Sequence, residues 1–381
     1  MIQRLLNLDK LIERKSCFLF GPRGTGKTFL IRQQKHASHF SIDLLKSDIF
    51  LRLKANPSLL ESMIDLESAK KVLIDEIQRE PLLLNEVHRL IEEKRLHFLL
   101  TGSSARKLKK EHANMLGGRA SIAHLFPFTW KELSDAKQFD LRRILQYGGL
   151  PRVYLSEDPR QELYDYIDSY LHEEIQGEAL VRNLPAFNNF LRLAALSSNQ
   201  LINYSNIAND LGVAINTVKE YFQILDDTLV GFRLEPWRRG KKLKTVATSK
   251  YYLFDMGVCQ ILQSLSEDSP PQSGTSFEHF VINEVRAYAS YSRLRIDLAF
   301  WRTQNQDEVD LIVGDHTAIE IKSAKKVSER FLSGLIKIEA EHSWKNRILV
   351  SNDPMDAKHA SGVLLLHWET FFRNLWNGKY F

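Results

Sequence analysis

The feature that most constrains this chain is the octapeptide Gly-Pro-Arg-Gly-Thr-Gly-Lys-Thr at positions 21–28. Its glycines let backbone N–H groups turn inward around phosphate oxygens without obstruction by side chains. An apolar run at 17–20 precedes it and a helical pattern at 27–34 follows, which is the setting of a phosphate-binding loop. The residues that we predict to bind ATP are Gly21, Pro22, Arg23, Gly24, Thr25, Gly26, Lys27 and Thr28.

Two loop residues and two later carboxylates predict a magnesium site with hydrolytic chemistry. Lys27 can reach the β- and γ-phosphates, and the Thr28 hydroxyl can ligate magnesium. The apolar run Lys-Val-Leu-Ile ends in Asp75 and Glu76. We expect Asp75 to hold Mg²⁺ and Glu76 to polarise the attacking water. The pattern therefore predicts an ATPase that uses Mg²⁺.

A third strand end, Phe-Leu-Leu-Thr-Gly-Ser-Ser at 98–104, offers small polar groups to the γ-phosphate or the water. The candidates are, in order, Ser103, Thr101 and Ser104; a simple helix cap is the alternative. An arginine that neutralises transition-state charge is also expected. Arg119 is the first candidate and Arg106 the second, against the alternative of a solvated surface arginine. If a neighbouring copy supplied this arginine, the chain would have to form a homo-oligomer.

The first third of the chain alternates short apolar runs with helical patterns, which predicts an α/β fold with a parallel sheet flanked by helices. The expected strands are 17–20, 39–43, 71–74 and 97–100, and the expected helices include 27–34 and 81–94. The pattern beyond it predicts four further segments. The predicted division is an ATPase core at 1–127, a helical connector at 128–184, a winged-helix domain at 185–263, a linker at 264–274 and an α/β domain at 275–381.

Residues 201–225 have the spacing of a helix-turn-helix. We expect a first helix at 204–211 capped by Ser205, a turn at Gly212, and a second helix at 216–225. Segments 230–234 and 237–244 are expected to pair as a basic hairpin, or wing. The residues predicted to contact DNA are Asn216, Thr217, Lys219, Arg238, Arg239, Lys241 and Lys242, with Lys244 in the same basic cluster. The alternative is a winged-helix module used only for packing.

The C-terminal segment carries polar residues at informative spacing. Glu278 opens an amphipathic helix, Asp310 lies in the strand pattern Glu-Val-Asp-Leu-Ile-Val, and Glu320 and Lys322 share one face of the next strand. Together they resemble the site of the PD-(D/E)xK nuclease fold, although Val309 stands where that motif's name has proline. The resemblance implies a restriction-endonuclease-like domain with a second divalent metal. An inactive relative used for binding or packing is the alternative.

Most of the chain resembles the prokaryotic AAA-type ATPases that carry a C-terminal domain of unknown function. The resemblance rests on the octapeptide, Leu-Ile-Asp-Glu-Ile-Gln, Leu-Thr-Gly-Ser-Ser, and Leu-Gly-Gly-Arg followed by Leu-Phe-Pro-Phe-Thr-Trp-Lys-Glu-Leu. It extends to Lys-Tyr-Tyr-Leu-Phe-Asp-Met-Gly at 250–257. It implies a nucleotide-hydrolysing core of the AAA kind, without a defined physiological substrate.

The amino-acid composition constrains the function less than these motifs do. The formal net charge of +5 permits nucleic-acid binding without arguing for it. Cys17 and Cys259 have no metal or redox spacing, so buried thiols in a cytoplasmic protein are expected. No apolar stretch suggests a membrane partner. We therefore expect ATP and ADP as ligands, with hydrolysis coupled to DNA binding or processing. The alternatives are an ATP-switched DNA nuclease and a nucleotide-gated regulatory scaffold.

Overall fold

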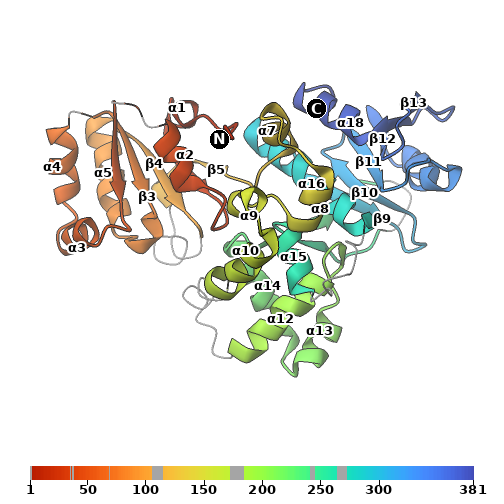
Figure 1. Cartoon of the computed structure of the whole chain (residues 1–381), viewed down its shortest axis with the longest axis horizontal. Helices are drawn as coiled ribbons and strands as arrows, with labels where there is room; N and C mark the ends of the chain where they lie inside the picture. The colour runs from red at the N-terminus through yellow and green to blue at the C-terminus, as the bar shows by residue number, and fades with distance from the viewer. Residues whose placement is uncertain are drawn as a thin grey trace.

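The chain folds into two bodies joined side by side (Figure 1). The computed structural model describes residues 2–34, 36, 38–67, 69–104, 115–171, 184–240, 245–263 and 273–381. The first body is built from the N-terminal residues through β5 (Ala120–His124), and the second from the helices and strands that follow it.

The first body is a five-stranded parallel sheet with helices on both faces, as predicted. Its strand order is β2-β3-β4-β1-β5. The remaining strands are β1 (Ser16–Phe20), β2 (His39–Asp43), β3 (Lys71–Asp75) and β4 (His97–Gly102). Because all the strands run in one direction, their carboxyl ends share one edge, and β4 lies between the strand that precedes the octapeptide and the strand that ends in Asp75. Polar residues at three strand ends are thereby brought together.

Both faces of this sheet are buried. One face packs Phe18, Ile74 and Leu100 against α3 (Ser47–Ala55), α4 (Leu59–Leu66) and α5 (Leu83–Lys94). The other packs Leu19 and Leu73 against α1 (Leu8–Leu11) and α2 (Lys27–Gln34). The near-continuous apolar runs that predicted these strands therefore reflect burial on both sides. Cys17, on the second face, and Cys259 are both buried free thiols, as expected.

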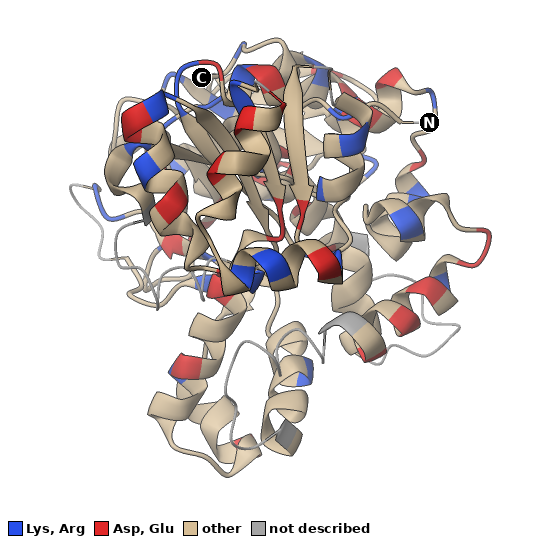
Figure 2. Cartoon of the chain, turned by 90° about the vertical axis from the view of Figure 1, so that its left-hand side faces the viewer, with Lys and Arg blue, Asp and Glu red and all other residues tan. Residues whose placement is uncertain are grey.

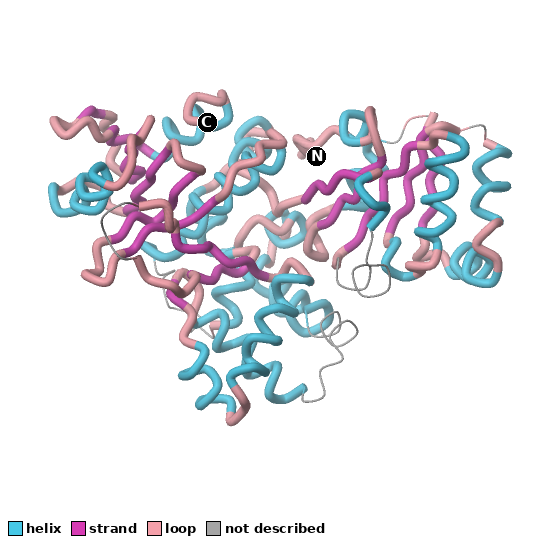
Figure 3. Tube along the Cα trace, turned by 180° about the vertical axis from the view of Figure 1, so that it is seen from behind, coloured by secondary structure: helices cyan, strands magenta, loops and turns pink. Residues whose placement is uncertain are grey.

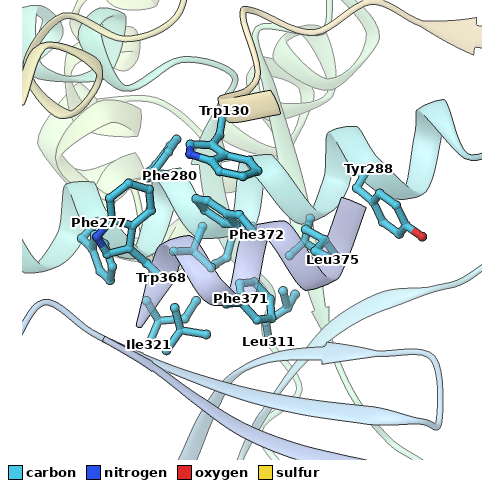
Figure 4. Close-up of a cluster of buried hydrophobic side chains, with 14 of the residues drawn as sticks. Trp130, Phe277, Phe280, Tyr288, Leu311, Ile321, Trp368, Phe371, Phe372 and Leu375 are labelled. Atoms are coloured by element: carbon cyan, nitrogen blue, oxygen red, sulfur yellow. The ribbon is translucent and has the colours of Figure 1, made fainter. Parts of the chain in front are cut away.

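A series of short helices leads from β5 into the second body: α7 (Trp130–Asp135), α8 (Leu141–Tyr147), α9 (Pro151–Leu155), α10 (Pro159–Asp165) and a π-helical turn, η3 (Tyr166–Leu171). Thr129 and Glu132 form a capping box at the start of α7. The first of these helices packs on the C-terminal core, where Trp130 lies beside Phe280 and Phe372 (Figure 4). This cluster anchors the short helices to the second body.

A helix-turn-helix follows α12 (Leu184–Leu196) and consists of α13 (Tyr204–Leu211) and α14 (Ile215–Asp227). Gly212 ends α13 at φ +63°, a left-handed conformation that suits glycine. The predicted cap was wrong: Asn203, not Ser205, accepts a hydrogen bond at the N-terminus of α13, because the helix begins at Tyr204 and its cap must precede it.

The predicted hairpin partner was also wrong. β7 (Gly231–Pro236) pairs antiparallel with β8 (Lys250–Leu253), and the described part of the expected partner segment, residues 237–240, forms no strand. Beyond β7 the backbone follows β9 (Leu298–Arg302) instead, and the Trp237 N–H donates to the carbonyl of Phe300. Pairing with a distant strand therefore replaced the local hairpin that sequence proximity suggested.

β7 joins the helix-turn-helix region to the C-terminal sheet. In the described residues one nine-stranded sheet runs in the order β13-β14-β12-β11-β10-β9-β7-β8-β6 (Figure 3). Its other strands are β6 (Gln200–Leu201), β10 (Glu308–Val313), β11 (Thr317–Lys322), β12 (Asn346–Ser351), β13 (Ala357–Lys358) and β14 (Leu364–His367). The C-terminal part is therefore a mixed sheet that is continuous with β7 and β8.

Helices cover the two faces of the C-terminal part of this sheet. α16 (Ser273–Tyr291) and α18 (Trp368–Trp376) pack on the face formed by Leu311, Ile319 and Ile321. α17 (Ser333–Lys337), with η4 (Glu329–Leu332) and η5 (Ile338–Ala340), packs on the opposite face. α15 (Met256–Leu262) follows β8 and joins the core of the helix-turn-helix region. No helix among the described residues combines the length and the apolar character needed to cross a membrane.

Candidate functional site

The octapeptide turns sharply between β1 and α2. Gly24 has φ +81° and Gly26 has φ +93°, so both positions need a conformation that larger residues rarely adopt. α2 begins at Lys27, and its N-terminus faces the loop with the partial positive charge that favours a bound anion. The predicted strand, loop and helix are thus all present.

Lys27 lies across the loop that it follows. Its ammonium group donates to the carbonyl oxygens of Gly21, at 2.7 Å, and Pro22, at 3.2 Å. The side chain is buried, with 5% of the residue exposed. These carbonyls are weaker partners than phosphate oxygens, because a charged acceptor strengthens a hydrogen bond about twofold. The lysine is therefore placed to exchange them for the phosphates of a nucleotide.

Asp75 joins the ends of three strands. One carboxylate oxygen accepts from the Thr28 hydroxyl at 2.7 Å, and the other accepts from the hydroxyl of Thr101. The residue is only 4% exposed, and in the part of the chain that the structure describes no lysine or arginine forms an ion pair with it. A hydroxyl and an otherwise uncompensated carboxylate are the oxygen ligands that Mg²⁺ prefers, so Thr28 and Asp75 fit the predicted metal site.

Glu76 is held in an unusual backbone conformation, with φ +61° and ψ +46°. Its N–H donates to the Thr101 hydroxyl at 3.2 Å, and its carboxylate accepts from the side-chain amide of Gln78. The same amide donates to Ser103 at 3.2 Å. Left-handed backbone at a non-glycine residue is costly and clusters at functional sites. The structure therefore brings together Glu76, Thr101 and the favoured Ser103, and adds Gln78, which the sequence analysis missed.

Of the two arginine candidates, the structure describes only Arg119, and it places this residue away from the phosphate loop. Arg119 precedes β5, whose first residue, Ala120, pairs with Ser16 at the start of β1. The octapeptide follows the other end of β1. A strand rises about 3.3 Å per residue, so that end lies about 15 Å from Ser16. Arg119 instead pairs with Glu92, so it lies at the edge opposite its own loop. Arg106 lies outside the described residues, whereas Ser104 is buried near the backbone of Asp227.

Buried side chains of both bodies connect the loop to the second body. Arg4 donates to the carbonyl of Thr25 at 2.6 Å and pairs with Glu132 of α7 at 2.9 Å. It also donates to the Tyr291 hydroxyl of α16 at 3.2 Å. Tyr166 donates to the carbonyl of Arg23 at 3.1 Å. The phosphate loop is thus held by groups from both bodies, and motif reading could not find them because each contact spans a long sequence separation.

A hollow of about 450 Å³ opens beside the start of the loop, at Gly21 and Pro22. Its far wall belongs to the second body and includes Arg233 and Arg286. The Arg286 guanidinium stacks on the ring of Phe232, 3.3 Å from its centroid, and burial lowers its pKa to about 9. The hollow therefore places cationic groups of the second body next to the loop.

The four residues predicted for the C-terminal site line one pocket of about 510 Å³. β10 and β11 are antiparallel with Leu311 opposite Ile319, so Asp310 lies beside Glu320. Lys322 lies 3.4 Å from Asp310 and 2.5 Å from Glu320. Glu278 reaches the pocket from α16, and burial raises its pKa to about 7. The juxtaposition that the strand spacing predicted is therefore present.

Three further charged residues, Lys250, Arg302 and Glu308, line this pocket, which we call the acidic pocket; Arg302 of β9 pairs with Glu308 at 3.2 Å. Lys250 of β8 ion-pairs with Glu308 and lies 3.6 Å from Glu278. Tyr252, on the same face of β8, donates to Glu278 at 2.8 Å. The alternation of side chains along a strand could have predicted part of this arrangement. Glu308 precedes Asp310 by two positions and Lys250 precedes Tyr252 by two, so the members of each pair lie on the same face of their strand. The meeting of the two pairs, however, depends on the fold.

The predicted DNA-contact residues are only partly described. Asn216 and Lys219 are exposed on α14, with Thr217 half-buried between them. Arg238 and Arg239 are exposed beyond β7, and Arg239 pairs with Asp315. The other members of the predicted basic cluster, Lys241, Lys242 and Lys244, lie outside the described residues. Along the ribbon in Figure 2, basic (blue) and acidic (red) residues are interspersed.

The fold and the loop define the first body as a P-loop nucleotide-binding domain of the AAA type. Residues 13–134 match the family described as AAA domain. Residues 138–269 and 273–371 match two families described as domains of unknown function, DUF8612 and DUF4143. The expected combination of an AAA-type core with a C-terminal domain of unknown function is therefore confirmed.

Relatives extend this likeness along the chain. An uncharacterized protein of Mycobacterium tuberculosis is 27% identical over 336 residues, which cover 84% of this chain and 74% of that protein. Shikimate kinase 1 of Erwinia tasmaniensis is 27% identical over 176 residues, 45% of this chain and 95% of the kinase. A structure of the replication initiator DnaA bound to AMPPCP and single-stranded DNA aligns with 57% of this chain and 85% of that chain. Its identity of 12% and TM-score of 0.30 are too low to carry an argument.

Proposed function

We propose that this protein binds ATP with Mg²⁺ and hydrolyses it, and that the second body responds to the nucleotide. The contact between Thr28, Asp75 and Thr101 carries the proposal, because it joins the phosphate loop to two other strand ends through one buried carboxylate. Thr28 and Asp75 would hold Mg²⁺, which supplies charge neutralisation at the phosphates.

The chain's own residues supply the remaining chemistry. Lys27 exchanges the loop carbonyls for the β- and γ-phosphate oxygens. Glu76 orients a water molecule toward the γ-phosphorus, and Gln78 fixes the direction of that carboxylate by a hydrogen bond. The bond from water oxygen to phosphorus forms as the bond to the bridging oxygen of ADP breaks. Ser103 supports Gln78 from β4.

Phosphate release by purified protein tests this role for Glu76. Glu76→Gln keeps the shape of the side chain but weakens it as a base, so we expect turnover to fall by about 100-fold or more. ATP binding should remain within about threefold of the wild type, since the substitution leaves the phosphate contacts in place. Glu93→Gln, an exposed residue of α5, is the matched control and should leave turnover unchanged. An undiminished rate in Glu76→Gln would contradict the mechanism.

We propose DNA binding as the task coupled to hydrolysis, because exposed polar and basic residues lie on α14 and beyond β7. Asn216 and Lys219 are exposed on the second helix of a helix-turn-helix, and Arg238 and Arg239 are exposed after the end of β7, where Arg239 pairs with Asp315. Affinity for duplex DNA should then fall with salt, and Arg238→Ala with Arg239→Ala should reduce the slope by about 0.9 per lost phosphate contact. Binding that is indifferent to both salt and the double variant would favour a regulatory scaffold.

A second candidate function is ATP-switched, metal-dependent DNA cleavage, favoured by the acidic pocket. Glu278, Asp310, Glu320 and Lys322 meet there in the arrangement that the nuclease resemblance implied. In such a nuclease, Asp310→Ala and Lys322→Ala would each abolish DNA cleavage while ATP turnover continued. Cleavage would also require a divalent cation bound by these carboxylates, so the charged groups already in the pocket decide whether this function is possible.

A further inference from the structure

The acidic pocket already contains a buried cation. The Lys250 side chain is 4% exposed, and its ammonium group forms an ion pair with Glu308. The same nitrogen lies 3.6 Å from a carboxylate oxygen of Glu278 and 4.0 Å from one of Asp310. Three carboxylates from α16 and β10 thus converge on a single positive charge from β8.

The neighbouring groups hold this ammonium in place. β8 lies between β7 and β6 in the sheet, so its backbone is paired on both sides. The Lys250 nitrogen also lies 5.5 Å from the ring centroid of Phe300. The carboxylates around it raise the pKa of Lys250 against the opposing effect of burial. The lysine is therefore charged. Its removal would leave Glu278 without an ion-pair partner among the described residues, while Arg302 still pairs with Glu308 and Lys322 with Asp310.

The carboxylates as arranged around Lys250 do not form a metal-binding set. Among the described residues, no three His, Cys, Asp or Glu side chains are placed so that they could share a metal ion. One carboxylate oxygen of Glu320 is nevertheless buried without a hydrogen-bond partner, and that side chain is 9% exposed. A buried oxygen in this state costs free energy and points to a missing ligand. The pocket therefore has the ligand chemistry of a cation site, with its central position taken.

We propose that the Lys250 ammonium occupies the position of a divalent cation, so that the pocket excludes metal as folded and becomes a metal site when Lys250 is removed. Without Lys250, the side chains of Glu278, Asp310 and Glu308, which are not placed to share a metal ion as folded, would turn toward the vacated position and bind a hard divalent cation there. This inference concerns the C-terminal body alone, so the outcome of the ATPase test neither supports nor opposes it.

Binding of Mn²⁺ to nucleotide-free protein, followed by electron paramagnetic resonance, tests the proposal. The wild type should show no Mn²⁺ site that depends on Asp310 at concentrations up to about 1 mM, the weak end of protein oxygen sites. Lys250→Met should gain one such site, with affinity raised at least about tenfold over the wild type. The double variant Lys250→Met, Asp310→Asn should lose it again. Lys322→Met is the matched control, because Lys322 also touches Asp310 but lies at the pocket mouth; it should gain no site.

Thermal unfolding gives a second measurement on the same proteins. Lys250→Met should melt at a lower temperature than the wild type, and Mn²⁺ should raise its melting temperature by several degrees but leave the double variant unchanged. Mn²⁺ binding by the wild type that Asp310→Asn abolishes would overturn the proposal, and this comparison needs no Lys250 variant. A folded Lys250→Met protein that binds no Mn²⁺ would overturn it equally.

Discussion

The phosphate loop and the acidic pocket each contain a buried aspartate and a lysine, but the charge of the aspartate is treated in opposite ways. Asp75 ends β3, whereas Asp310 lies inside β10. Asp75 is held by the neutral hydroxyls of Thr28 and Thr101, while Lys27 is turned toward carbonyl oxygens. Asp310 instead lies near two ammonium groups, those of Lys250 and Lys322. The negative charge of Asp75 therefore remains available to a bound cation, whereas that of Asp310 is compensated by the two lysines.

The difference in the partners of Asp75 and Asp310 indicates which of the two sites can bind a metal ion. A carboxylate held by hydroxyls retains its attraction for a hard cation, since neutral donors fix its position without cancelling its charge. A carboxylate beside a buried ammonium group gains little from a second cation, because the two cations would repel each other at low dielectric. We therefore propose that Mg²⁺ binds in the first body and that the acidic pocket is a closed charge network.

The largest effect expected from this comparison is on ATP turnover. Asp75→Asn keeps the hydrogen-bonding shape but removes the charge, so phosphate release should fall by about 100-fold or more. Asp310→Asn, the matched change in the acidic pocket, should stay within about twofold of the wild type. The measurement is phosphate release at saturating ATP over a range of Mg²⁺ concentrations. Equal loss of phosphate release in the two variants would contradict the assignment of ATP turnover to Asp75 and not to Asp310.

A second effect concerns the structural cation beside the loop. Arg4 is buried against Glu132, in the way that Lys250 is buried against Glu308. Arg4→Met would leave Glu132 buried without compensation and should lower the free energy of unfolding by about 3 kcal/mol. Arg89→Met, which removes solvent-screened ion pairs on α5, should lower the free energy of unfolding much less than Arg4→Met does. Denaturant unfolding measures both, and equal costs would argue against a structural role for Arg4.

The smallest effect expected is a pH dependence of stability. Burial raises the pKa of Glu278 and of Glu284 to about 7, from an ordinary value of 4.5. Between these values the folded chain keeps protons that the unfolded chain releases, so stability falls as pH rises from about 4.5 to about 7. Each group contributes on the order of 2 kcal/mol. Glu284→Gln should therefore flatten the decline, as measured by denaturant unfolding across this range; an unchanged slope would contradict the assignment.

The sequence predicted the parts of the fold that depend on local pattern. The parallel strands of the first body, the loop and α2 follow from apolar runs and glycines, because neighbouring residues largely determine these elements. The contact of Asp75 with Thr28 could be expected from the motifs. Its second partner, Thr101, depends on β4 lying between β1 and β3, which is a tertiary fact.

The parts that escaped prediction depend on long-range pairing. Arg119 follows a suggestive glycine pair, but sequence cannot tell that β5 begins at the edge of the sheet opposite the loop. The partner of β7 was misassigned because a nearer segment seemed available. Lys250 enters the acidic pocket only because β8 and β9 flank β7 in one sheet. Each of these placements was decided by packing between distant segments, which propensity does not report.

The number of Mn²⁺ ions bound in the presence of a non-hydrolysable ATP analogue shows whether the metal site depends on Asp75 or on Asp310. We expect one Mn²⁺ per chain, with its affinity weakened at least about tenfold by Asp75→Asn and unchanged by Asp310→Asn. A second Mn²⁺ that disappears in Asp310→Asn, or a single one that is indifferent to Asp75→Asn, would contradict the account.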